Sequence, residues 1–377
     1  MRICSVRSSF FTQNFSIMHE FEDIRKILVI KLRHIGDVLL TVPVFRALRE
    51  NFPDAHISAL VNSGTEEVLS GHPLIDEVIT YNRGIKNLHH VQRYIKELSF
   101  LKGIRSGGFD MSVDLTSGDR AAILSFLSGA RYRFAYDPRG DGFWGKRYLY
   151  THRARKDGSQ HMVLQNLDII KQFGISTEDI TVDMAIPKDT RSFVKNVFER
   201  NTIKETEAVV HIHPTSRWLF KCWKDEYMAE VIDRLTDRGI RVIVTASPVA
   251  KELEKAKRIL SMLKGISLPI DLCGSTTIKQ LAAIAAAATL FFGVDSAPMH
   301  IAAATGTPVI ALFGPTGHAQ WGPWGAGHTV LTKNMKCMEC KRDTCDGVEV
   351  RKCLEAITPD EVFDAITRAL RLKGIAR

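Results

Sequence analysis

The sequence predicts an α/β protein with two doubly wound parallel sheets, one after the other along the chain. Short apolar runs rich in β-branched residues alternate with helical patterns, which is typical of βαβ units. The alternation begins again near residue 208, after a polar stretch. At 377 residues the chain is also too long for one ordinary hydrophobic core. Two domains of one class therefore explain the sequence better than a single large sheet.

The first domain is predicted over residues 25–200. Its expected strands are "ILVIK" (27–31), "HISALVN" (56–62), "EVITYN" (77–82) and "FDMSVDLT" (109–116), and its clearest helices are "TVPVFRALREN" (41–51) and "VQRYIKELSFLKGI" (91–104). Residues 1–24 show no pattern of a packed element, so we expect a poorly ordered extension. Met18 is an alternative start of translation.

The second domain is predicted over residues 201–377, and the polar stretch "RNTIKETE" (200–207) is the expected linker. Its strands are expected in "AVVHIHPTS" (208–216), "RVIVTASP" (241–248), "PIDLCGS" (269–275), "TLFFGVDS" (289–296) and "PVIALFGPT" (308–316). The last helix is expected in "TPDEVFDAITRALRL" (358–372). Ligands of such sheets bind beyond the carboxyl ends of the strands, which is where the motifs below lie.

The overall charge and hydropathy restrict the class of partner. A net charge of +9 indicates anionic partners, which include nucleic acid, nucleotide sugars and acidic membrane surfaces. No apolar run approaches the roughly 20 residues of a membrane-spanning helix. The first residues lack the continuous apolar core of a signal peptide. We therefore predict a cytoplasmic protein whose contact with a membrane is peripheral.

The most specific motif is "FFGVDSAPMHIAAATGTPVIALFGPT" (291–316). A strand ends at Val294, and a helix of small residues starts near Ala297. The free N–H groups at that helix start and the small side chain of Ser296 suit a diphosphate. An ordinary helix cap by Asp295 or Ser296 is the structural alternative. The second small-residue turn, "GPT", favours the anion site because it falls at the same sheet edge.

Hydrogen-bond donors follow the first strand of the second domain, in "HIHPTSRWLFKCW" (211–223). Thr215, Ser216, Arg217 and Lys221 precede the next helix, where a cation can neutralise phosphate. A solvated basic loop is the alternative. We interpret Lys221 as functional and Trp223 as a packing residue.

Two further features stand near the second domain's strands. Glu252 lies on the helix after "RVIVTASP", where a carboxylate can bind ribose hydroxyls, although a solvated helix face is the simpler interpretation. Cys337, Cys340, Cys345 and Cys353 have spacings that resemble a zinc knuckle. They lie in a late loop away from the strand ends, so we interpret them as structural or plain thiols and assign no metal.

In the first domain, "IKLRHIGDVLL" (30–40) places Asp37 where a parallel strand passes into a helix. An N-cap is the simplest interpretation of such an aspartate. A cap does not, however, explain the neighbouring Lys31, Arg33 and His34. Further along, basic and aromatic residues are interleaved between 131 and 156, which suits nucleic acid or an acidic glycolipid, and no nucleic-acid-binding motif accompanies them.

Together, "IKLRHIGDVLL", "PTSRWLFKCW" (214–223) and "GVDSAPMHIAAATGTPVIALFGPT" (293–316) resemble the bacterial glycosyltransferase family 9, the ADP-heptose:lipopolysaccharide heptosyltransferases. The similarity covers roughly Lys26 to the C-terminus. Within the family the sequence is most similar to the group that adds the branching third heptose of the inner core. Heptosyltransferase I or II activity is the alternative, although the bulky Trp218-Leu219-Phe220 departs from heptosyltransferase I.

The resemblance implies a GT-B fold, in which two Rossmann-like domains face one another across a cleft. It implies that the first domain binds the lipopolysaccharide acceptor, that the second binds ADP-heptose, and that the last helix packs back on the first domain. It further implies inverting transfer with no cofactor and no active-site metal. The acceptor then belongs to the inner leaflet of the cytoplasmic membrane, and we predict peripheral attachment through Arg131, Arg133, Lys146 and Arg147.

The resemblance also implies roles for individual residues. The catalytic carboxylate of the family falls on Asp37 and its phosphate-contacting lysine on Lys221. The predicted donor-binding residues are Thr215, Ser216, Arg217, Lys221, Glu252, Asp295, Ser296, Ala297 and His300, and the predicted acceptor-binding residues are Lys31, Arg33, His34, Arg131 and Arg133.

Two rival functions use the same fold. A non-catalytic protein that binds sugar nucleotides or lipopolysaccharide is disfavoured by the joint presence of Asp37, Lys221 and Asp295. A nicotinamide-dependent oxidoreductase is disfavoured more strongly, because no GxGxxG follows a first strand.

Overall fold

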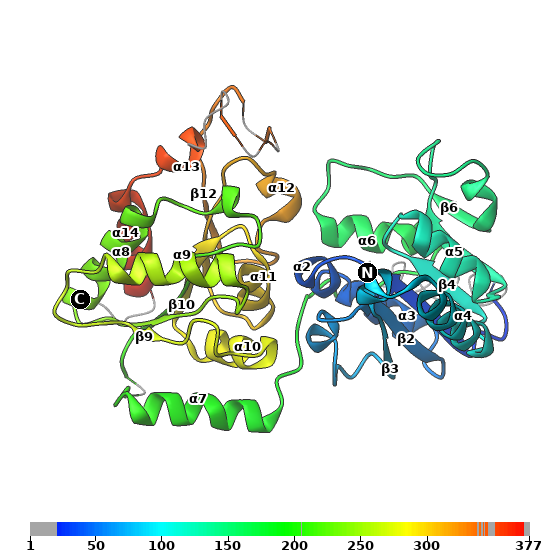
Figure 1. The fold of residues 1–377 in the computed structure, drawn as a ribbon, viewed down its shortest axis with the longest axis horizontal. Coiled ribbons are helices and arrows are strands. Elements are labelled where there is room, and N and C mark those ends of the chain that lie inside the picture. The colour runs from blue at the N-terminus through cyan, green and yellow to red at the C-terminus, as the bar shows by residue number, and fades with distance from the viewer. Residues whose placement is uncertain are drawn as a thin grey trace, which may run out of the picture. The chain divides into compact units, whose positions relative to one another are not determined.

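The computed structural model describes residues 21–204, 206–337, 339–340, 342, 344–345 and 351–372. The chain divides into two compact units, residues 1–181 and 182–377 (Figure 1). Each unit contains one six-stranded parallel sheet flanked by helices. The predicted fold class, an α/β chain with two Rossmann-like doubly wound sheets, is therefore confirmed. In the described residues, no helix combines the length and apolar character needed to cross a bilayer.

The sheet of the first unit has the strand order β3-β2-β1-β4-β5-β6. Its strands are β1 (Lys26–Lys31), β2 (His56–Asn62), β3 (Glu77–Tyr81), β4 (Met111–Asp114), β5 (Tyr132–Tyr136) and β6 (His152–Ala154). β1 is central and almost wholly buried, which explains why its sequence is continuously apolar rather than alternating.

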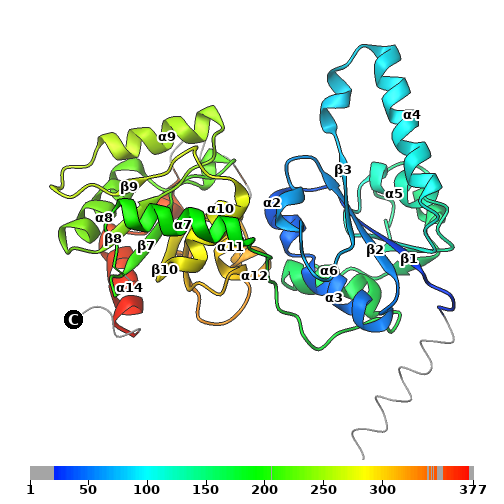
Figure 2. The ribbon, with the colours of Figure 1, turned by 90° about the horizontal axis from the view of Figure 1, so that it is seen from below.

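Helices cover both faces of this sheet. They are α2 (Ile35–Leu39), α3 (Val42–Asn51), α4 (His90–Ser106), α5 (Asp119–Leu127) and α6 (Met162–Lys171), with short 3₁₀ turns η1 (Glu66–Val68), η2 (Arg83–Asn87) and η3 (Lys146–Leu149). Figure 2 shows α3 and α6 together on one face and α4 and α5 together on the other. The core on the α4–α5 face joins residues of β1, β2, α4 and α5, among them Ile30, Leu60, Ile104 and Leu124.

The sheet of the second unit has the order β12-β11-β10-β7-β8-β9, which repeats the connectivity of the first. Its strands are β7 (Val209–His213), β8 (Arg241–Val244), β9 (Ile270–Asp271), β10 (Leu290–Val294), β11 (Val309–Leu312) and β12 (Thr329–Leu331). The first strand, β7, lies between β8 and β10, so the strand order reverses between β7 and β10. This reversal is the usual ligand-binding position of a doubly wound sheet.

Helices also cover both faces of the second sheet. They are α7 (Lys188–Arg200), α8 (Asp225–Asp237), α9 (Ala250–Ser261), α10 (Ile278–Ala287), α11 (Ala297–Ala304), α12 (His318–Trp321), α13 (Lys352–Glu355) and α14 (Pro359–Leu372), with the 3₁₀ turn η4 (Leu219–Lys221). The start of α10 is fixed by a capping box, because Thr277 and Gln280 satisfy each other's backbone N–H groups. The start of α14 is held in a similar way by Thr358 and Glu361.

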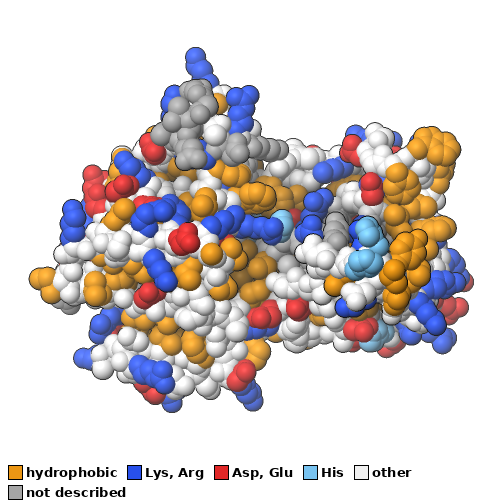
Figure 3. Space-filling view, in the orientation of Figure 1, with side chains coloured by type: hydrophobic (Ala, Val, Ile, Leu, Met, Phe, Trp, Pro, Cys, Tyr) orange, Lys and Arg blue, Asp and Glu red, His pale blue; other side chains and the backbone are white. Residues whose placement is uncertain are grey.

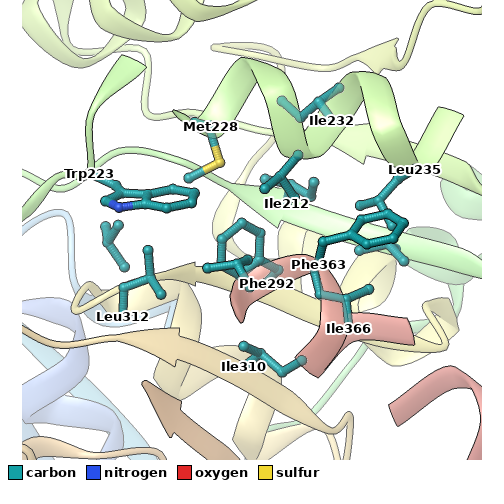
Figure 4. Close-up of a cluster of buried hydrophobic side chains, with 14 of the residues drawn as sticks. Ile212, Trp223, Met228, Ile232, Leu235, Phe292, Ile310, Leu312, Phe363 and Ile366 are labelled. Atoms are coloured by element: carbon teal, nitrogen blue, oxygen red, sulfur yellow. The ribbon is translucent and has the colours of Figure 1, made fainter. Parts of the chain in front are cut away.

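The largest core of the second unit lies between its sheet and α8, α9 and α14 (Figure 4). Phe292 of β10 and Phe363 of α14 are both buried in it, together with Trp223. The Trp223 indole donates hydrogen bonds to the carbonyls of Leu354, at 3.0 Å, and Ile357, at 3.2 Å. Trp223 is thus the packing residue that the sequence indicated, and it ties the chain around α13 to the core.

One predicted domain boundary and the predicted position of the last helix differ from the structure. The units divide after Thr181 rather than after residue 200, because α7 packs against α10, with Val194 in one core cluster with Ala283 and Ile284, and belongs to the second unit. The last helix, α14, was expected on the first domain, but its apolar face is buried in the core of the second unit. Four buried residues, Val362, Phe363, Ile366 and Leu370, fix it there.

The N-terminal extension was expected to be unpacked through residue 24, and here the structure also differs. Phe21 is buried, with its ring centroid 5.1 Å from that of Tyr132 and 5.5 Å from that of Phe134. The carbonyl of Glu22 accepts a hydrogen bond from Arg131 at 2.6 Å. The chain thus packs on β5 before β1 begins. Residues 1–20, including Met18, lie outside the described residues.

Candidate functional site

In the second unit, the predicted donor residues gather at the carboxyl ends of β7 and β10. Gly293 of β10 pairs with His213 of β7 in the sheet register. A Cβ on Gly293 would lie 2.8 Å from the His213 carbonyl oxygen, so a side chain there would force the two strands apart. The glycine in "FFGVDS" is therefore required by close strand packing directly below the site.

An ion pair occupies this edge of the sheet. Lys221 Nζ lies 2.7 Å from Asp295 Oδ2, and both side chains are largely shielded from solvent. Thr316, in the turn after β11, donates a hydrogen bond to the same carboxylate oxygen at 2.6 Å. Sequence reasoning placed the "GPT" turn at this edge but did not single out Thr316. The structure thus brings a cation, a carboxylate and a hydroxyl from three loops together.

The start of α11 completes this edge. Ser296 precedes the helix in extended backbone conformation, and its side chain makes no capping hydrogen bond. Its Oγ is shielded from solvent and has no hydrogen-bond partner among the described residues. Ser216 Oγ instead donates to the backbone carbonyl of Asp295 at 3.2 Å. The helix therefore begins with small side chains at Ser296 and Ala297 and with N–H groups that can bind an anion.

A buried polar chain runs from the centre of β7 to α9. The Thr245 hydroxyl lies 2.8 Å from His211 Nε2 and 2.9 Å from His213 Nδ1. Thr215 lies 3.4 Å from His213 Nε2, and its hydroxyl donates to Glu252 Oε2 at 3.4 Å. Burial lowers the pKa of each histidine to about 3 and raises the pKa of Glu252.

Only some of the predicted donor residues belong to this buried series of hydrogen bonds. Thr215 and Glu252 are buried members of it, so Glu252 does not lie on a solvated helix face. Thr245 and the two histidines were not among the predicted residues, although "HIHPTS" places both histidines on the same face of a strand. Arg217 is exposed and stacks on Trp218, with its guanidinium carbon 5.8 Å from the ring centroid. His300 is buried on α11.

In the first unit, Lys31 at the end of β1 is buried and holds neighbouring elements together. Its Nζ donates to the Leu115 carbonyl at 2.8 Å and to Asn166 Oδ1 at 2.9 Å. Burial lowers the pKa of Lys31 to about 8, against the opposing effect of the negative Asp37. This placement differs from the expected contact with an acceptor, because the ammonium group is engaged by the protein itself.

Asp37 lies in the first turn of α2, two residues after the helix begins, and His34 occupies the N-cap. The simple capping interpretation of Asp37 is therefore wrong. Within the described ranges, its half-exposed carboxylate takes part in no hydrogen bond or ion pair. Arg33 is exposed and donates to the Thr116 carbonyl at 3.1 Å. The carboxylate of Asp37 is thus available to a ligand, with basic residues beside it.

Asp114, at the end of the neighbouring strand β4, is a second carboxylate that the sequence did not single out. It is fully buried and accepts hydrogen bonds from Thr116 N at 2.7 Å, Ser117 N at 3.2 Å and Tyr150 Oη at 2.5 Å. Burial raises the pKa of Asp114 and also that of the Tyr150 phenol. These bonds fix the loop after β4.

The basic residues predicted for acceptor or membrane contact are largely engaged by the protein. Arg133 donates to the carbonyls of Leu149 and Ala130, each at 2.6 Å. Lys146 is buried, and its Nζ lies 3.1 Å from Asp119. Arg131 is exposed, yet it donates to Glu22 as described above. The predicted four-residue basic patch is therefore corrected, since Arg133 and Lys146 hold loops of the first unit.

The cysteines of the late loop do not form a metal centre in the part of the chain that the structure describes. No group of three or more His, Cys, Asp or Glu side chains is placed there to hold a metal ion. Cys353 is buried and Cys337 exposed, and all four are free thiols. Burial raises the pKa of Cys353, and the nearby Cys345 and Cys340 act in the same direction.

Comparison with known proteins adds sequence and fold relationships to this geometry. The family model of glycosyltransferase family 9 (heptosyltransferase) matches residues 97–350. Lipopolysaccharide heptosyltransferase 3 of Escherichia coli (strain K12) is 36% identical over 296 residues, which cover 78% of this chain and 83% of that protein.

Two solved structures share the fold over nearly the whole chain. A glycosyl transferase of family 9 from Veillonella parvula superposes with a TM-score of 0.79 at 23% identity, covering 94% of this chain and 99% of the other. The ADP-heptose LPS heptosyltransferase II of Escherichia coli gives a TM-score of 0.74 at 21% identity, covering 93% and 99%. These likenesses confirm the GT-B fold class predicted from the sequence.

Proposed function

We propose that this chain, which belongs to the heptosyltransferases of glycosyltransferase family 9, transfers heptose from ADP-heptose to the inner core of lipopolysaccharide. It is a glycosyltransferase by family. The observation that best supports the donor is the Lys221–Asp295 ion pair beside the start of α11. A diphosphate fits this position because a lysine and free helix N–H groups both favour negative charge.

In the donor site, Lys221 and the N–H groups at Ser296 and Ala297 bind the diphosphate. Asp295 orients the heptose hydroxyls, because its carboxylate accepts hydrogen bonds and repels phosphate. Thr215 and Glu252 lie one strand further along the edge, where the adenosine ribose would bind. The buried chain through His213 and Thr245 supports this contact by holding Thr215 in place.

In the acceptor site, Asp37 acts as general base. The acceptor hydroxyl oxygen attacks the anomeric carbon, the carbon–oxygen bond to the β-phosphate breaks, and the hydroxyl proton passes to the Asp37 carboxylate. The electron pair of the broken bond leaves with ADP. Direct displacement of this kind inverts the anomeric centre. The availability of the Asp37 carboxylate supports this role, since a base must be free to receive the proton.

The leaving ADP requires stabilisation of its developing charge. Lys221 and the N-terminal end of α11 supply positive potential where that charge appears. We propose that the reaction uses neither a cofactor nor an active-site metal ion. The acceptor is the heptose that receives the branching third heptose, as 36% identity to a lipopolysaccharide heptosyltransferase 3 supports. The enzyme acts in the cytoplasm, peripherally on the inner leaflet.

The decisive experiment offers ADP-heptose to a series of defined truncated lipopolysaccharide acceptors and maps the product by NMR. Transfer only to acceptors that already carry two heptoses, with an inverted anomeric linkage, is the expected result. Transfer to an acceptor without heptose would indicate heptosyltransferase I activity, and donor binding without transfer to any acceptor would indicate a binding protein. The same assay in EDTA should keep full activity. A loss restored by magnesium or manganese would contradict the metal-free mechanism.

A further inference from the structure

The first half of α4 exposes an apolar stripe. Val91, Tyr94, Ile95 and Leu98 are 62%, 73%, 62% and 56% exposed, and they follow the spacing i, i+3, i+4, i+7. Residues with this spacing lie on one face of a helix and normally pack into a core. Here they face solvent instead.

The same helix has a second apolar face that is already packed. Ile104 is buried in the core of the first unit, and Phe100 and Leu101 pack against that core. Glu97, on the same side, accepts hydrogen bonds from Tyr81 Oη at 2.8 Å and from Arg120 at 3.0 Å. The exposed stripe is therefore additional to what the fold needs, so packing within this unit does not account for it.

The stripe is continued by neighbouring elements. On α5, Ile123 and Phe126 are exposed. Phe143 and Trp144, just before η3, and Tyr148, within η3, are also exposed, with Trp144 almost completely so at 96%. Figure 3 shows apolar side chains gathered over the region of α4 and α5. Among the described residues, all large apolar side chains exposed in the first unit lie between positions 91 and 148. We call this surface the α4 face.

Basic side chains accompany these apolar ones. Helix α4 carries four of them, all exposed: Arg93, Lys96, Lys102 and Arg105. Its one acidic residue, Glu97, is neutralised by Arg120. Nearby, the Arg147 guanidinium carbon lies 5.9 Å from the centroid of the Tyr148 ring. The α4 face is thus apolar, aromatic and positively charged at once.

A groove runs along the stripe. It has a volume of about 350 Å³, and its walls combine the apolar Tyr94, Leu98 and Leu101 with the polar His90, Arg93, Glu97 and Arg120. Because Arg120 is paired with Glu97, Arg93 supplies the remaining positive charge of the groove. Apolar atoms and an anionic group of an amphiphile can therefore be accommodated side by side.

We propose that the α4 face seats the protein on an anionic lipid bilayer. Tyrosine and tryptophan favour the boundary between headgroups and acyl chains, and leucine, isoleucine and valine enter the apolar layer. The basic side chains are attracted by the anionic headgroups. A second copy of this chain would instead bring the basic residues of both copies together, which disfavours self-association through this face. The bilayer is therefore the occupant that matches both the charge and the apolar surface.

This inference rests on the proposed function only for the location of the acceptor in a membrane. It replaces the attachment surface expected from the sequence, because Arg133 and Lys146 are engaged inside the first unit. It also predicts that membrane binding responds differently to salt. Purely electrostatic binding is abolished by high salt, since charges are screened beyond roughly 10 Å at 0.1 M. Binding that includes the apolar stripe weakens in salt but persists.

The test is sedimentation of the full chain with vesicles, without donor or acceptor. The variant Tyr94→Gln/Ile95→Gln/Leu98→Gln should bind vesicles of phosphatidylglycerol and phosphatidylethanolamine at least tenfold more weakly than wild type. A matched control, Ile266→Gln/Leu268→Gln, changes residues of the second unit that are 101% and 74% exposed, and it should bind normally. Neutral phosphatidylcholine vesicles should bind wild type poorly. Equal binding of both variants, or no binding of wild type at low salt, would overturn the proposal.

A second readout follows Trp144 directly. Its fluorescence should shift to the blue on anionic vesicles and be quenched by brominated acyl chains, and both signals should be lost in Trp144→Phe. Light scattering at the same concentrations tests the other occupant: a dimer that the triple glutamine variant dissociates would overturn the bilayer assignment.

An acceptor freed of its acyl chains separates this inference from the proposed function. If the α4 face is a membrane surface, the triple variant transfers heptose normally to the deacylated acceptor and slowly to acceptor in vesicles. Equal slowing on both acceptors would contradict the membrane role. If wild type transfers heptose to neither acceptor, the proposed function is contradicted. The vesicle sedimentation then tests the membrane role of the α4 face by itself.

Discussion

The two units have the same strand order yet use the carboxyl edges of their sheets differently. In each, the first strand lies between the second and the fourth, β1 between β2 and β4 and β7 between β8 and β10. In each, a carboxylate stands at the end of the fourth strand, Asp114 in the first unit and Asp295 in the second. The surroundings of these two carboxylates determine what each edge can bind.

Asp114 is satisfied by its own loop and by Tyr150, and no side-chain cation of the described residues forms an ion pair with it. Asp295 lies against Lys221 and Thr316. Lys31 and Lys221 also differ in what they contact. Lys31 holds Leu115 and Asn166, whereas Lys221 comes from a loop and meets a carboxylate at the sheet edge. The first unit therefore keeps its buried polar groups for structure and offers Asp37 on a separate helix. The second unit places Lys221, Asp295 and Thr316 at the sheet edge where we propose that the donor binds.

The largest expected effect follows from changing Asp37. Asp37→Asn should slow transfer by ~10² or more, the scale of losing a general base, because the amide cannot take up the proton. ADP-heptose affinity should stay unchanged, since we assign the donor to the second unit. Steady-state rates and calorimetry on the variant measure both quantities. Asp54→Asn, an exposed aspartate of the same unit, serves as the control. Turnover close to wild type in the Asp37 variant would remove it from the mechanism.

A smaller effect is expected at Lys221. Lys221→Ala should weaken ADP-heptose binding by roughly 10- to 30-fold, because one charge-assisted contact is worth about 1.5–2 kcal/mol. Calorimetric titration with ADP-heptose measures the change. Lys224→Ala removes an exposed lysine three residues away and should leave the affinity intact. If Lys221→Ala and Lys224→Ala bind ADP-heptose equally well, Lys221 is only a structural partner of Asp295. Lys221 and Lys31 would then both serve the structure and would not differ in ligand binding.

The smallest expected effect is the response of stability to acid, in which the buried histidines of the second unit and Asp114 of the first unit act in opposite directions. Burial lowers the folded pKa of His211 and His213 to about 3, so between about pH 3 and 6.5 the unfolded chain binds protons that the folded chain does not. The stability that the two neutral histidines contribute should therefore fall as pH falls through this window. The raised folded pKa of Asp114 acts in the opposite direction: its contribution falls as pH rises above 3.8.

Urea unfolding followed by tryptophan fluorescence tests this response, because four of the five tryptophans lie in the second unit. Between pH 7 and pH 5.5 one such histidine should reduce the free energy of unfolding by about 1 kcal/mol. His211→Gln should remove that part of the pH dependence, whereas His56→Gln, on an exposed site of the first unit, should not. A pH dependence identical in wild type and His211→Gln would show that folding does not lower the pKa of His211.

The sequence by itself determined the fold class and most of the residues at the proposed donor-binding edge of the second sheet. The two series of apolar runs predicted both sheets because buried parallel strands must be continuously apolar. "FFGVDSAPMH" and "PTSRWLFK" placed Asp295, Ser296 and Lys221 at one edge, since the carboxyl ends of parallel strands meet there. Such inferences succeed because they depend on local period and on the order of elements along the chain.

Only the tertiary structure decided which polar groups are free. Lys31, Lys146 and Arg133 look in the sequence like solvent-facing cations, and each proves to be engaged by carbonyl or side-chain oxygens that are between three and 135 residues away in the sequence. The partners of Asp114 and the chain from His211 to Glu252 likewise arise from long-range packing. The helix pattern of 91–104 also did not show which of its two apolar faces would be buried. A single sequence records the residue type but not its neighbours in space, and those neighbours set burial, pKa and availability to a ligand.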